Sequence, residues 1–308
     1  MIVKLGYIGR MNVHQLELLR ELGALGSVQA VADALRLSPS AVSQQLKLLQ
    51  RSTPVPLTER RGRQLRLTPA GEELADAAAA VATALAHARE TARSLGRSSV
   101  DEVSVAAFNS AALAFFPALL AAVASEPLVR VRLRDEDVAQ DAFDKLTRTQ
   151  DIVIAHRLDH TPPWPPGVSA TPLLHEPLDV ALPVGHALAG DAKLSPQDLA
   201  RQPWITTHDG YPLVATLDAI AAVAGHPIDI AHRVNEFSVA IELVRAGAGV
   251  AFVPRWTVPT PAGVVLRPVA GPSPRRHIDA LHRPEKAVRS AVTVVLGHLQ
   301  HIAGGLAG

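Results

Sequence analysis

The stretch from Ser27 to Gly71 constrains the chain most, because it joins two short helical patterns to a basic hairpin pattern. The first helix begins at Ser27, whose hydroxyl suits an N-cap, and its apolar face is formed by Val28, Val31, Ala32 and Leu35. The second begins at Ser38, with Pro39 at the first helical position, where a missing N–H costs nothing. Its apolar stripe is formed by Val42, Leu46 and Leu49. The sequence therefore predicts two helices joined by a tight turn.

The opposite face of the second helix is polar. Its side chains are short or flexible groups of the kind that reach base edges and phosphates, namely Ser40, Ser43, Gln44 and Lys47. Helix–turn–helix proteins place such a helix in the major groove of DNA, with its N-terminal residues against the bases. An ordinary helical hairpin with a solvated polar face fits these residues equally well.

The charge around the helix pair favours DNA. From Arg36 to Arg66 the chain has seven Lys or Arg residues against one acid, Glu59, whereas the whole chain has a net charge of +1. Such a concentration is typical of a surface that binds phosphate in a salt-dependent way. Gly62 suits the tip of a tight hairpin, and a wing there would bring its arginines to the DNA backbone or minor groove. These arginines are Arg60, Arg61 and Arg63. The alternative is a solvated basic loop.

The order and spacing of residues along the second helix and the hairpin are those of one protein family. They are Ser38, Ala41, Val42, Ser43, Gln45 and Leu49, then Val55-Pro56-Leu57, Glu59-Arg60, Gly62-Arg63 and Leu67-Thr68-Pro69-Ala70-Gly71. On these residues the chain resembles the LysR-type transcriptional regulators. The resemblance implies a winged helix–turn–helix domain at 11–68 that binds double-stranded promoter DNA. It adds Ser38, Ala41 and Gln45 to the expected DNA contacts.

The chain departs from the family pattern where the wing meets the helices. Thr53 and Pro54 stand where the family usually has Leu-Gly, Thr58 stands where it usually has Phe, and Gln50 replaces a usual Glu. We therefore expect the local packing and the angle of the wing to differ from the family pattern.

Residues Pro69 to Leu95 form the next helical pattern, with Thr68 as its cap. Apolar residues recur at alternating spacings of four and three, at Leu74, Ala78, Val81, Leu85, Ala88, Ala92 and Leu95. Such a seam indicates a linker helix, 69–97, that pairs with a second copy. The resemblance implies antiparallel pairing of two linker helices, and further pairing of the C-terminal domains into a homotetramer. The alternative is a helix that folds back on its own domain.

From Val100 onward, patterns of strands and helices alternate. The predicted elements are strands at Val103–Phe108, Val129–Arg134 and Asp151–Ala155, with helices at Ala111–Ala124 and Val138–Thr149. This order implies a parallel sheet with helices on its faces.

A second such unit, about Leu173 to Pro254, follows a proline-rich joint at Thr161–Gly167. We expect Val264–Pro268 and the strand around Ile278–Leu281 to return to the first unit before a closing helix, Glu285–Ala303. The resemblance implies a two-lobed effector-binding domain similar to periplasmic binding proteins. It spans 100–303, with lobe I at about 100–158 and 264–303 and lobe II at about 170–258. The expected fold class is thus α/β, preceded by an all-α-type winged helix–turn–helix domain.

Polar residues at the predicted strand ends are candidates for a small-molecule site, because ligands of open α/β sheets bind beyond the carboxyl ends of the strands. They are Asn109, Ser110, Asp135, Glu136, Thr206, Thr207, His208 and Ser238. Each fits a plain cap or turn residue as well. Helix N-termini at Ser110 and Ser238 favour a carboxylate, whereas the acids at Asp135, Glu136 and Asp137 favour an amine. We therefore expect an amino-acid-like or other carboxylate effector.

Three other sequence features bear on the class of protein. The chain has no cysteine, which excludes disulfides, thiolate metal sites and the thiol-based peroxide sensing of one branch of the family. His156 and His160 have metal-like spacing but no third ligand nearby in the sequence, so we interpret them as surface or hinge residues and expect no metal and no cofactor. There is no apolar run of about 20 residues, and residues 1–10 lack the pattern of a signal peptide. We interpret those ten as an extension or an upstream start.

Two alternatives belong to other functional classes. A solute-binding module would leave the basic helix pair and the heptad seam without a role, and it would normally need an export signal. A small-molecule enzyme of the α/β class is disfavoured because the sequence has no G-x-S-x-G elbow, no glycine-rich phosphate loop and no H-E-x-x-H. We therefore expect a cytoplasmic, nucleoid-associated bacterial regulator and not an enzyme.

Overall fold

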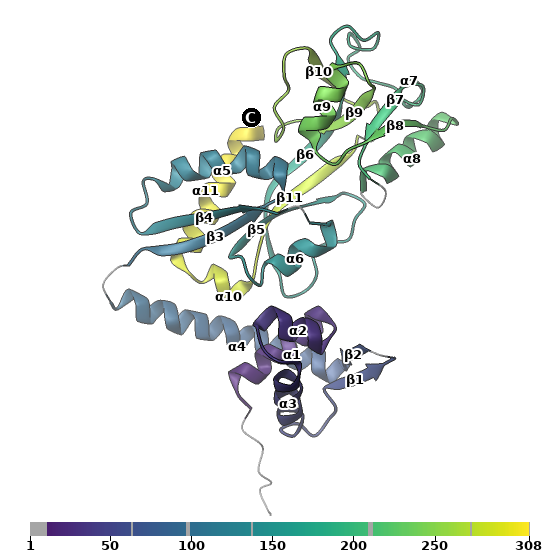
Figure 1. Ribbon diagram of the computed structural model, residues 1–308. Coiled ribbons are helices and arrows are strands. Elements are labelled where there is room, and N and C mark those ends of the chain that lie inside the picture. The colour runs from purple at the N-terminus through teal and green to yellow at the C-terminus, as the bar shows by residue number, and fades with distance from the viewer. Residues whose placement is uncertain are drawn as a thin grey trace, which may run out of the picture. The chain divides into compact units, whose positions relative to one another are not determined.

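The computed structural model describes residues 11–62, 64–96, 99–136, 138–208, 212–271 and 273–307. The chain divides into two compact units (Figure 1). Unit 1 comprises Met1–Ser98 with Arg283–Ser290, and unit 2 comprises Ser99–His282 with Ala291–Gly308. Among the described residues, every helix is too short or too polar to cross a lipid bilayer.

Unit 1 begins with three helices, α1 (Val13–Leu25), α2 (Val28–Leu35) and α3 (Pro39–Gln50). The predicted caps of α2 and α3 are confirmed: Ala30 N donates to Ser27 Oγ at 3.1 Å, and Ala41 N donates to Ser38 Oγ at 3.2 Å. The predicted apolar stripes meet in one core, to which α1 contributes Leu18, Leu19 and Leu22. Because Val31, Val42 and Leu49 are fully buried there, the polar face of α3 is turned outward.

A two-stranded hairpin follows, formed by β1 (Thr58–Arg61) and β2 (Gln64–Leu67). The strands pair antiparallel, with Arg61 opposite Gln64 at the turn. Gly62 has φ +63°, a left-handed conformation that glycine adopts without the Cβ clash that other residues meet. The predicted hairpin with a glycine at its tip is thus confirmed. Arg63 lies outside the described residues.

Hydrogen bonds explain two departures from the family pattern between α3 and the hairpin. Gln50 donates from Nε2 to Val55 O at 2.8 Å and accepts at Oε1 from Leu57 N at 2.8 Å. A carboxylate at position 50 could only accept. Thr53 Oγ1 donates to Gln50 O at 3.2 Å. The loop is therefore held by an amide that bridges two backbone groups, while a change in the angle of the wing stays a prediction.

The long helix α4 (Pro69–Ser94) is capped by Thr68, whose Oγ1 accepts from Gly71 N at 3.1 Å. A Cβ on Gly71 would lie 2.0 Å from Leu57 O, so only glycine fits this approach of helix and loop. Early seam residues Leu74 and Ala78 pack in the core of unit 1. Later in the seam, Val81 is 38% exposed and Leu95 is 84% exposed. The helix folds back on its own unit at its start and leaves the later seam uncovered.

Unit 1 also includes the segment Arg283–Ser290, which contains α10 (Pro284–Ala287). Two ion pairs hold this segment to α1. Arg20 Nη2 lies 2.8 Å from Glu285 Oε1, and Arg283 Nη1 lies 2.6 Å from Glu21 Oε1. The Glu21 side chain is almost completely buried, so the second pair is a specific contact and not a surface one.

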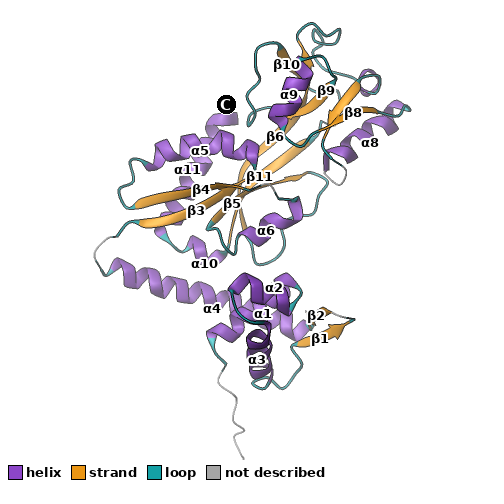
Figure 2. Cartoon of the chain, viewed as in Figure 1, coloured by secondary structure: helices purple, strands orange, loops and turns teal. Residues whose placement is uncertain are grey.

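Lobe I of unit 2 has the strand order β4–β3–β5–β11–β6. The parallel arrangement of the first three strands was predicted and is confirmed. The helices α5 and α11 accompany this sheet, and both supply side chains to its core (Figure 2). The bounds are β3 (Asp101–Ala107), α5 (Asn109–Val123), β4 (Val129–Asp135), β5 (Ile152–Leu158), β11 (Arg275–His282) and α11 (Ser290–Ala307).

The predicted helix Val138–Thr149 is wrong in extent. The chain there forms a single 3-10 turn, η1 (Gln140–Ala142), and one helical turn, α6 (Phe143–Leu146). Thr147 and Thr149 end it, because their hydroxyls donate back to Asp144 O and Leu146 O and so compete with the helical backbone bonds.

A single strand, β6 (Ser169–Pro183), runs through both lobes. Its first part pairs with β11, and from Leu178 onward it pairs with β9. Pro172 lies beside an irregularity in the pairing with β11, and Pro177 lies where the partner changes. Prolines are tolerated in a central strand only at such places. The prediction that lobe II begins at about 170 is therefore wrong, since residues 169–177 belong to the sheet of lobe I.

Lobe II has a sheet of β6, β9, β7 and β8, with β10 on the other edge of β6. The prediction that Val264–Pro268 returns to lobe I is wrong, because β10 pairs with residues 180–183 of β6 and Val264 packs in the core of lobe II. Helices α8 and α9 supply side chains to two separate apolar clusters of this sheet. The bounds are α7 (Pro196–Leu199), β7 (Pro203–Thr206), α8 (Pro212–Ala224), β8 (Asp229–Arg233), α9 (Phe237–Arg245), β9 (Val250–Pro254) and β10 (Val264–Arg267).

Candidate functional site

The outward face of α3 carries the residues predicted to contact DNA. Ser40, Gln44 and Lys47 are exposed, and Ser43 is half-buried. This face is a row of hydrogen-bonding groups on a helix whose other side is anchored in the core of unit 1. Such a helix can present donors and acceptors to base edges without first moving.

Three further predicted DNA contacts have roles inside unit 1. Ser38 is used as a cap, and its Oγ lies 3.0 Å from Ser40 Oγ. Ala41 supplies the backbone N–H that is capped. Gln45 Oε1 accepts a 3.2 Å hydrogen bond from Nε2 of Gln15, which is buried. Gln45 is thereby held in a fixed orientation at the edge of the polar face.

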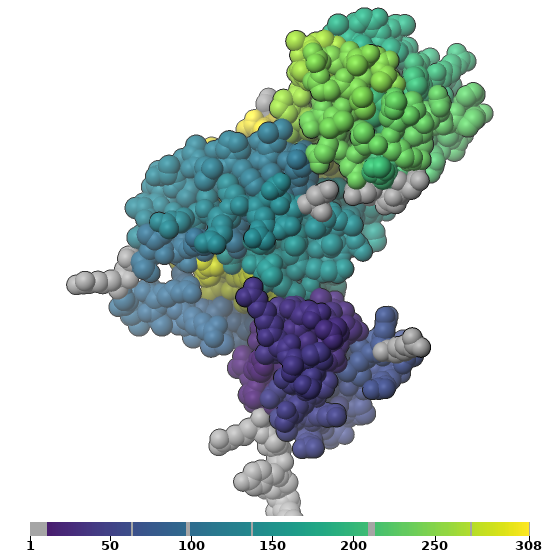
Figure 3. Space-filling view, in the orientation of Figure 1, coloured from purple at the N-terminus to yellow at the C-terminus, as the bar shows by residue number. Residues whose placement is uncertain are grey.

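The β1–β2 hairpin projects from the surface of unit 1 (Figure 3). Arg60 and Arg61 are both exposed on it. Arg61 Nε lies 2.7 Å from Glu59 Oε1, in an ion pair with side chains 71% and 40% exposed. This pair is weak because it is open to water. A phosphate could therefore replace Glu59 as the partner of Arg61.

Unit 2 contains a pocket at the carboxyl end of β5 and at the starts of α5 and α9. About half of its lining residues are apolar or aromatic and the others are polar or charged, so the pocket offers both kinds of contact to a small molecule. The lining residues are Phe108, Asn109, Ser110, Val138, His156, Leu158, Leu178, Thr207, Leu213, Asn235, Glu236, Phe237 and Arg276.

Three of the eight residues predicted for this site, Asn109, Ser110 and Thr207, line the pocket. The other five lie outside its lining. Asp135 is the last residue of the edge strand β4, which lies one strand beyond β3, and Glu136 follows it. Thr206 precedes Thr207 in an extended segment, where successive side chains point to opposite faces. The side chain of Thr206 therefore points away from the pocket that Thr207 lines.

The last two predicted residues are His208 and Ser238. His208 is exposed, and its N–H donates to Asn235 Oδ1 at 3.1 Å. Ser238 was predicted to cap the helix that follows, and this is wrong. The N-cap is Glu236, and Ser238 is an exposed residue of the first turn of α9. Asp137 lies outside the described residues.

Arg276, which lines the pocket, belongs to a buried ion pair. Arg276 and Glu176, 3% and 0% exposed, are joined by a 2.9 Å bond from Nε to Oε2. Glu176 Oε1 also accepts from the N–H groups of Trp256 and Thr257, each at 2.7 Å. Arg276 Nη2 donates to Ser110 Oγ at 3.1 Å, which ties the guanidinium to the start of α5. Burial lowers the pKa of Arg276, and the charge of Glu176 opposes that shift.

Aromatic rings hold the Arg276 guanidinium from two sides. Its central carbon lies 5.1 Å from the ring centroid of Phe108 and 5.7 Å from that of Phe237. Cation–π attraction of this kind is strongest where water is excluded. Arg276 was not among the site residues predicted from the sequence. The signal for it was a pair of arginines, Arg275 and Arg276, at the start of an otherwise largely apolar strand pattern.

His156 also lines the pocket, and the interpretation of it as a surface or hinge residue is wrong. Its ring packs edge-on against Phe108, with centroids 4.6 Å apart, and against Phe143 at 5.5 Å. Burial, and then the charge of Arg276, lower the pKa of His156 to about 3, so the ring is neutral at physiological pH. His160, its predicted spacing partner, is exposed.

Two buried polar atoms of the pocket residues have no hydrogen-bond partner within the described part of the chain. They are His156 Nδ1 and Thr207 Oγ1. Such atoms normally find a partner, because leaving one unsatisfied costs about 1–3 kcal/mol. A bound molecule could supply it.

The first turns of two helices face the same pocket. The N-caps of α5 and α9 are Phe108 and Glu236, and neither has a side-chain cap hydrogen bond. The backbone N–H groups at these starts therefore need other partners, and they carry partial positive charge.

The chain thus joins a winged helix unit to a two-lobed α/β unit with a pocket between its strand ends. This combination defines a ligand-responsive DNA-binding protein.

Comparison with known proteins identifies the family. A family model described as the LysR substrate binding domain matches residues 96–303, and one described as the bacterial regulatory helix-turn-helix protein of the LysR family matches residues 13–72. The chain belongs to the LysR family of transcriptional regulators, which bind DNA and respond to small molecules through the C-terminal domain. The family predicted from the sequence, its fold class and its function are thereby confirmed.

Individual relatives agree with this family. The chain is 26% identical over 263 residues to the octopine catabolism/uptake operon regulatory protein OccR of Rhizobium meliloti. The matched residues cover 84% of this chain and 85% of OccR. It is 25% identical over 284 residues to the transcriptional dual regulator OxyR of Escherichia coli, over 91% and 92% of the two chains. The solved structure of full-length OxyR from Pseudomonas aeruginosa has the same fold, with a TM-score of 0.59 at 20% identity over 94% of this chain and 95% of that one.

Proposed function

We propose that the effector of this regulator is a small carboxylate with a flat apolar body and one further hydrogen-bonding group. The observation that carries the proposal is the convergence of Arg276 and the uncapped first turns of α5 and α9 on one pocket. All three supply positive potential or N–H donors, which stabilise an anion. The Arg276 charge is held in place by Glu176 and so needs no reorganisation when a ligand binds.

The rest of the pocket supports an apolar body. Two aromatic rings, Phe108 and Phe237, and three leucines, Leu158, Leu178 and Leu213, line it. Burying apolar surface contributes about 25 cal/mol per Å² of area removed from water. A ring-sized group would therefore supply much of the affinity, and the polar groups would set its orientation.

The unsatisfied atoms of His156 and Thr207 favour a second polar group on the ligand. A neutral imidazole can either donate or accept, and so can a hydroxyl. A hydroxyl or carbonyl at some distance from the carboxylate could bond to either one. An amine is disfavoured because Asp135 and Glu136 lie outside the pocket, which leaves Glu236 as the acid among the described lining residues.

The pocket is suited to binding and not to catalysis. Glu176 and Arg276 are engaged with each other, so neither is free to exchange a proton with a ligand. His156 is neutral because of its low pKa, and its ring is packed between aromatic side chains. We infer that the chain is a regulator without an enzymatic activity of its own.

The action on DNA that we propose has three parts. The polar face of α3 reads bases, with Ser43 and Gln44 foremost, and the hairpin arginines bind phosphates. Two chains pair through the uncovered seam of α4, and further pairing gives a tetramer on promoter DNA in the bacterial cytoplasm. The effector shifts the assembly between two arrangements, which requires unequal affinity for them.

A ligand panel tests the proposal. An aromatic hydroxycarboxylic acid, its amide and the corresponding amine are added to the purified chain, and the melting temperature is measured. We expect the acid to stabilise the protein and the amide and amine to do so less. The Ser110→Trp variant, which fills the pocket, should lose the shift, whereas Ser125→Trp, at an exposed serine after α5, should keep it. A larger shift with the amine than with the acid would contradict the proposal.

A further inference from the structure

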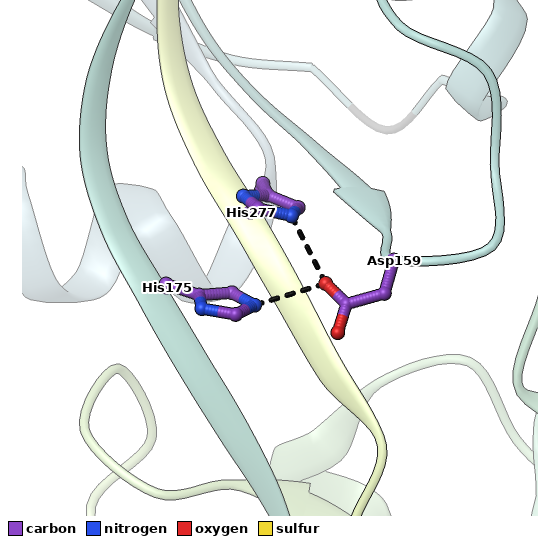
Figure 4. Close-up of side chains that lie close together, drawn as sticks. All are labelled: Asp159, His175 and His277. Atoms are coloured by element: carbon purple, nitrogen blue, oxygen red, sulfur yellow. Dashed lines mark hydrogen bonds and ion pairs between the residues drawn. The ribbon is translucent and has the colours of Figure 1, made fainter.

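Three side chains from separate segments of unit 2 lie together outside the effector pocket (Figure 4). Asp159 Oδ1 lies 2.9 Å from Nε2 of His175 and 2.9 Å from Nε2 of His277. The two imidazole rings are stacked, with centroids 4.3 Å apart and planes inclined by 11°. Both ring nitrogens thus point to the same carboxylate oxygen.

The sheet fixes this arrangement. His175 of β6 and His277 of β11 are direct cross-strand partners. On its other edge β11 pairs with β5, where Arg276 is opposite Leu158, the residue directly before Asp159. Three adjacent backbone segments therefore set the spacing of the three side chains, and no loop has to rearrange to bring them together.

The donor set matches the preferences of a divalent transition metal. Imidazole nitrogen and carboxylate oxygen bind Zn²⁺ at about 2.0–2.2 Å. The three ligand atoms lie within 4.8 Å of one another, so one ion between them can reach all three after small side-chain rotations. The nearby cation Arg157 is offset by Asp279, whose Oδ2 lies 3.7 Å from Arg157 Nε.

We propose that Asp159, His175 and His277 bind one divalent transition-metal ion of the zinc class, with solvent in the remaining coordination position. Asp159 and His175 are exposed, so an ion can enter from water without opening the fold. The ion replaces the contacts of Asp159 Oδ1 with Nε2 of His175 and Nε2 of His277. These contacts are the competing explanation for the cluster, since two histidines that share a carboxylate are stable without a metal.

The site lies on the back of the strands that carry the buried ion pair. His175 is followed by Glu176, and His277 is preceded by Arg276, and successive side chains of a strand point to opposite faces. Glu176 and Arg276 are buried toward the pocket, whereas His175 is exposed on the other side. A bound ion would fasten β6 to β11 next to the irregularity between Ile278 and Asp279.

Metal titration of the full-length, tag-free chain tests the proposal. The protein is treated with a chelator, exchanged into metal-free buffer and titrated with Zn²⁺ against a chromophoric chelator, with Co²⁺ as a spectroscopic probe. We expect one ion per chain, and we expect the visible absorption bands of the Co²⁺-loaded protein to be those of four-coordinate cobalt. His175→Asn and His277→Asn should each weaken zinc binding by at least about 10-fold, since even outer-shell changes at metal sites commonly have effects of this size.

The control is His160→Asn, the same substitution at the exposed histidine next to Asp159. This variant should bind zinc like the unaltered chain, and circular dichroism should show all three variants folded. Equal zinc affinity in the unaltered chain and in folded His175→Asn and His277→Asn would overturn the proposal, and so would the absence of binding at micromolar zinc. Because these readouts involve neither carboxylate ligands nor DNA, they are independent of the effector proposal.

Discussion

At the scale of single residues, the most important feature of unit 2 is the buried positive charge of Arg276 and the groups that stabilise it. A buried ion in a protein is expensive unless a partner and hydrogen bonds compensate it, and breaking such a pair costs about 3–5 kcal/mol. Glu176 supplies the opposite charge, and Thr257 and Ser110 accept further hydrogen bonds from the guanidinium. The same charge also disfavours protonation of His156.

His156 should make stability depend on pH. Its pKa falls from 6.5 to about 3 on folding, so the unfolded chain binds a proton that the folded chain does not. Its contribution is fully present above pH 6.5 and is lost as the pH falls toward about 3, with about 1.4 kcal/mol lost by pH 5.5. In urea unfolding at pH 7.5 and 5.5, the His156→Phe variant should lose less stability on acidification than the unaltered chain. Identical losses in both would mean that His156 is protonated in the folded state.

Arg61 and Glu59 should act in opposite directions on DNA. Arg61→Ala should weaken binding to all DNA sequences alike. It should also reduce the slope of log K against log salt concentration by about one, because one phosphate contact is lost. Glu59→Gln frees Arg61 from its 2.7 Å ion pair and should strengthen binding to all sequences. Fluorescence anisotropy with a specific and a random duplex at several salt concentrations measures both. Arg130→Ala, at an exposed arginine of β4, is the control, and an unchanged affinity and slope for Arg61→Ala would remove the hairpin from the interface.

At the scale of elements, the first turns of α4 fit the interpretation of a helix packed on its own domain, whereas dimerisation through its later turns stays a prediction. Its first turns fold back on unit 1, where Leu74 and Ala78 join the core. Farther along, Val81 and Leu95 are exposed although they continue the same apolar seam. A helix that leaves such a stripe in water gains stability when a second helix covers it.

A charge in the uncovered part of α4 should weaken dimerisation. Ala88 lies in the seam and Ala80 lies off it, and both are exposed. Ala88→Glu should raise the dimer dissociation constant roughly 10-fold or more, because pairing would bury an unpaired carboxylate. Sedimentation equilibrium measures the constant. Ala80→Glu adds the same charge to the same helix and should dimerise normally, so an equal effect of both substitutions would argue against the seam.

At the scale of the whole molecule, the pocket proposed for the effector lies in unit 2 and the helices α1–α3 lie in unit 1, and the chain connects the two units. The segment Arg283–Ser290 follows β11 directly, and β11 carries Arg276 of the pocket. The same segment is part of unit 1, where Glu285 and Arg283 form ion pairs with Arg20 and Glu21. Because this segment continues the chain directly from β11, we expect a shift of β11 to alter these ion pairs with α1.

Weakening this connection should reduce the effector response. Glu285→Gln removes the charge that Arg20 binds at 2.8 Å. We expect near-normal DNA affinity without effector and a smaller change in affinity on adding one, measured by anisotropy with and without a saturating carboxylate effector. Glu242→Gln breaks the exposed pair with Arg245 in unit 2 and serves as the control. A full response in Glu285→Gln would exclude the Arg20 contact from the signalling route.

The sequence by itself determined the features that depend on neighbours along the chain. The caps at Ser27, Ser38 and Thr68 and the glycine at the hairpin tip involve hydrogen bonds and backbone angles spanning only a few residues, so their signals are local. The alternation of strands and helices in lobe I follows from periodicity in the same way. Asn109, Ser110 and Thr207 were found because they follow or flank strand ends.

Only the tertiary structure decided which distant segments meet. Arg276 and Glu176 are 100 residues apart, and nothing in their spacing shows that β11 and β6 are neighbours. The packing of His156 against Phe108 and Phe143, the place of β10 in lobe II and the meeting of His175, His277 and Asp159 likewise depend on tertiary contacts. An apolar strand pattern shows that a segment is buried in a sheet, but the choice of partner follows from the packing energy of the whole sheet, to which every strand contributes.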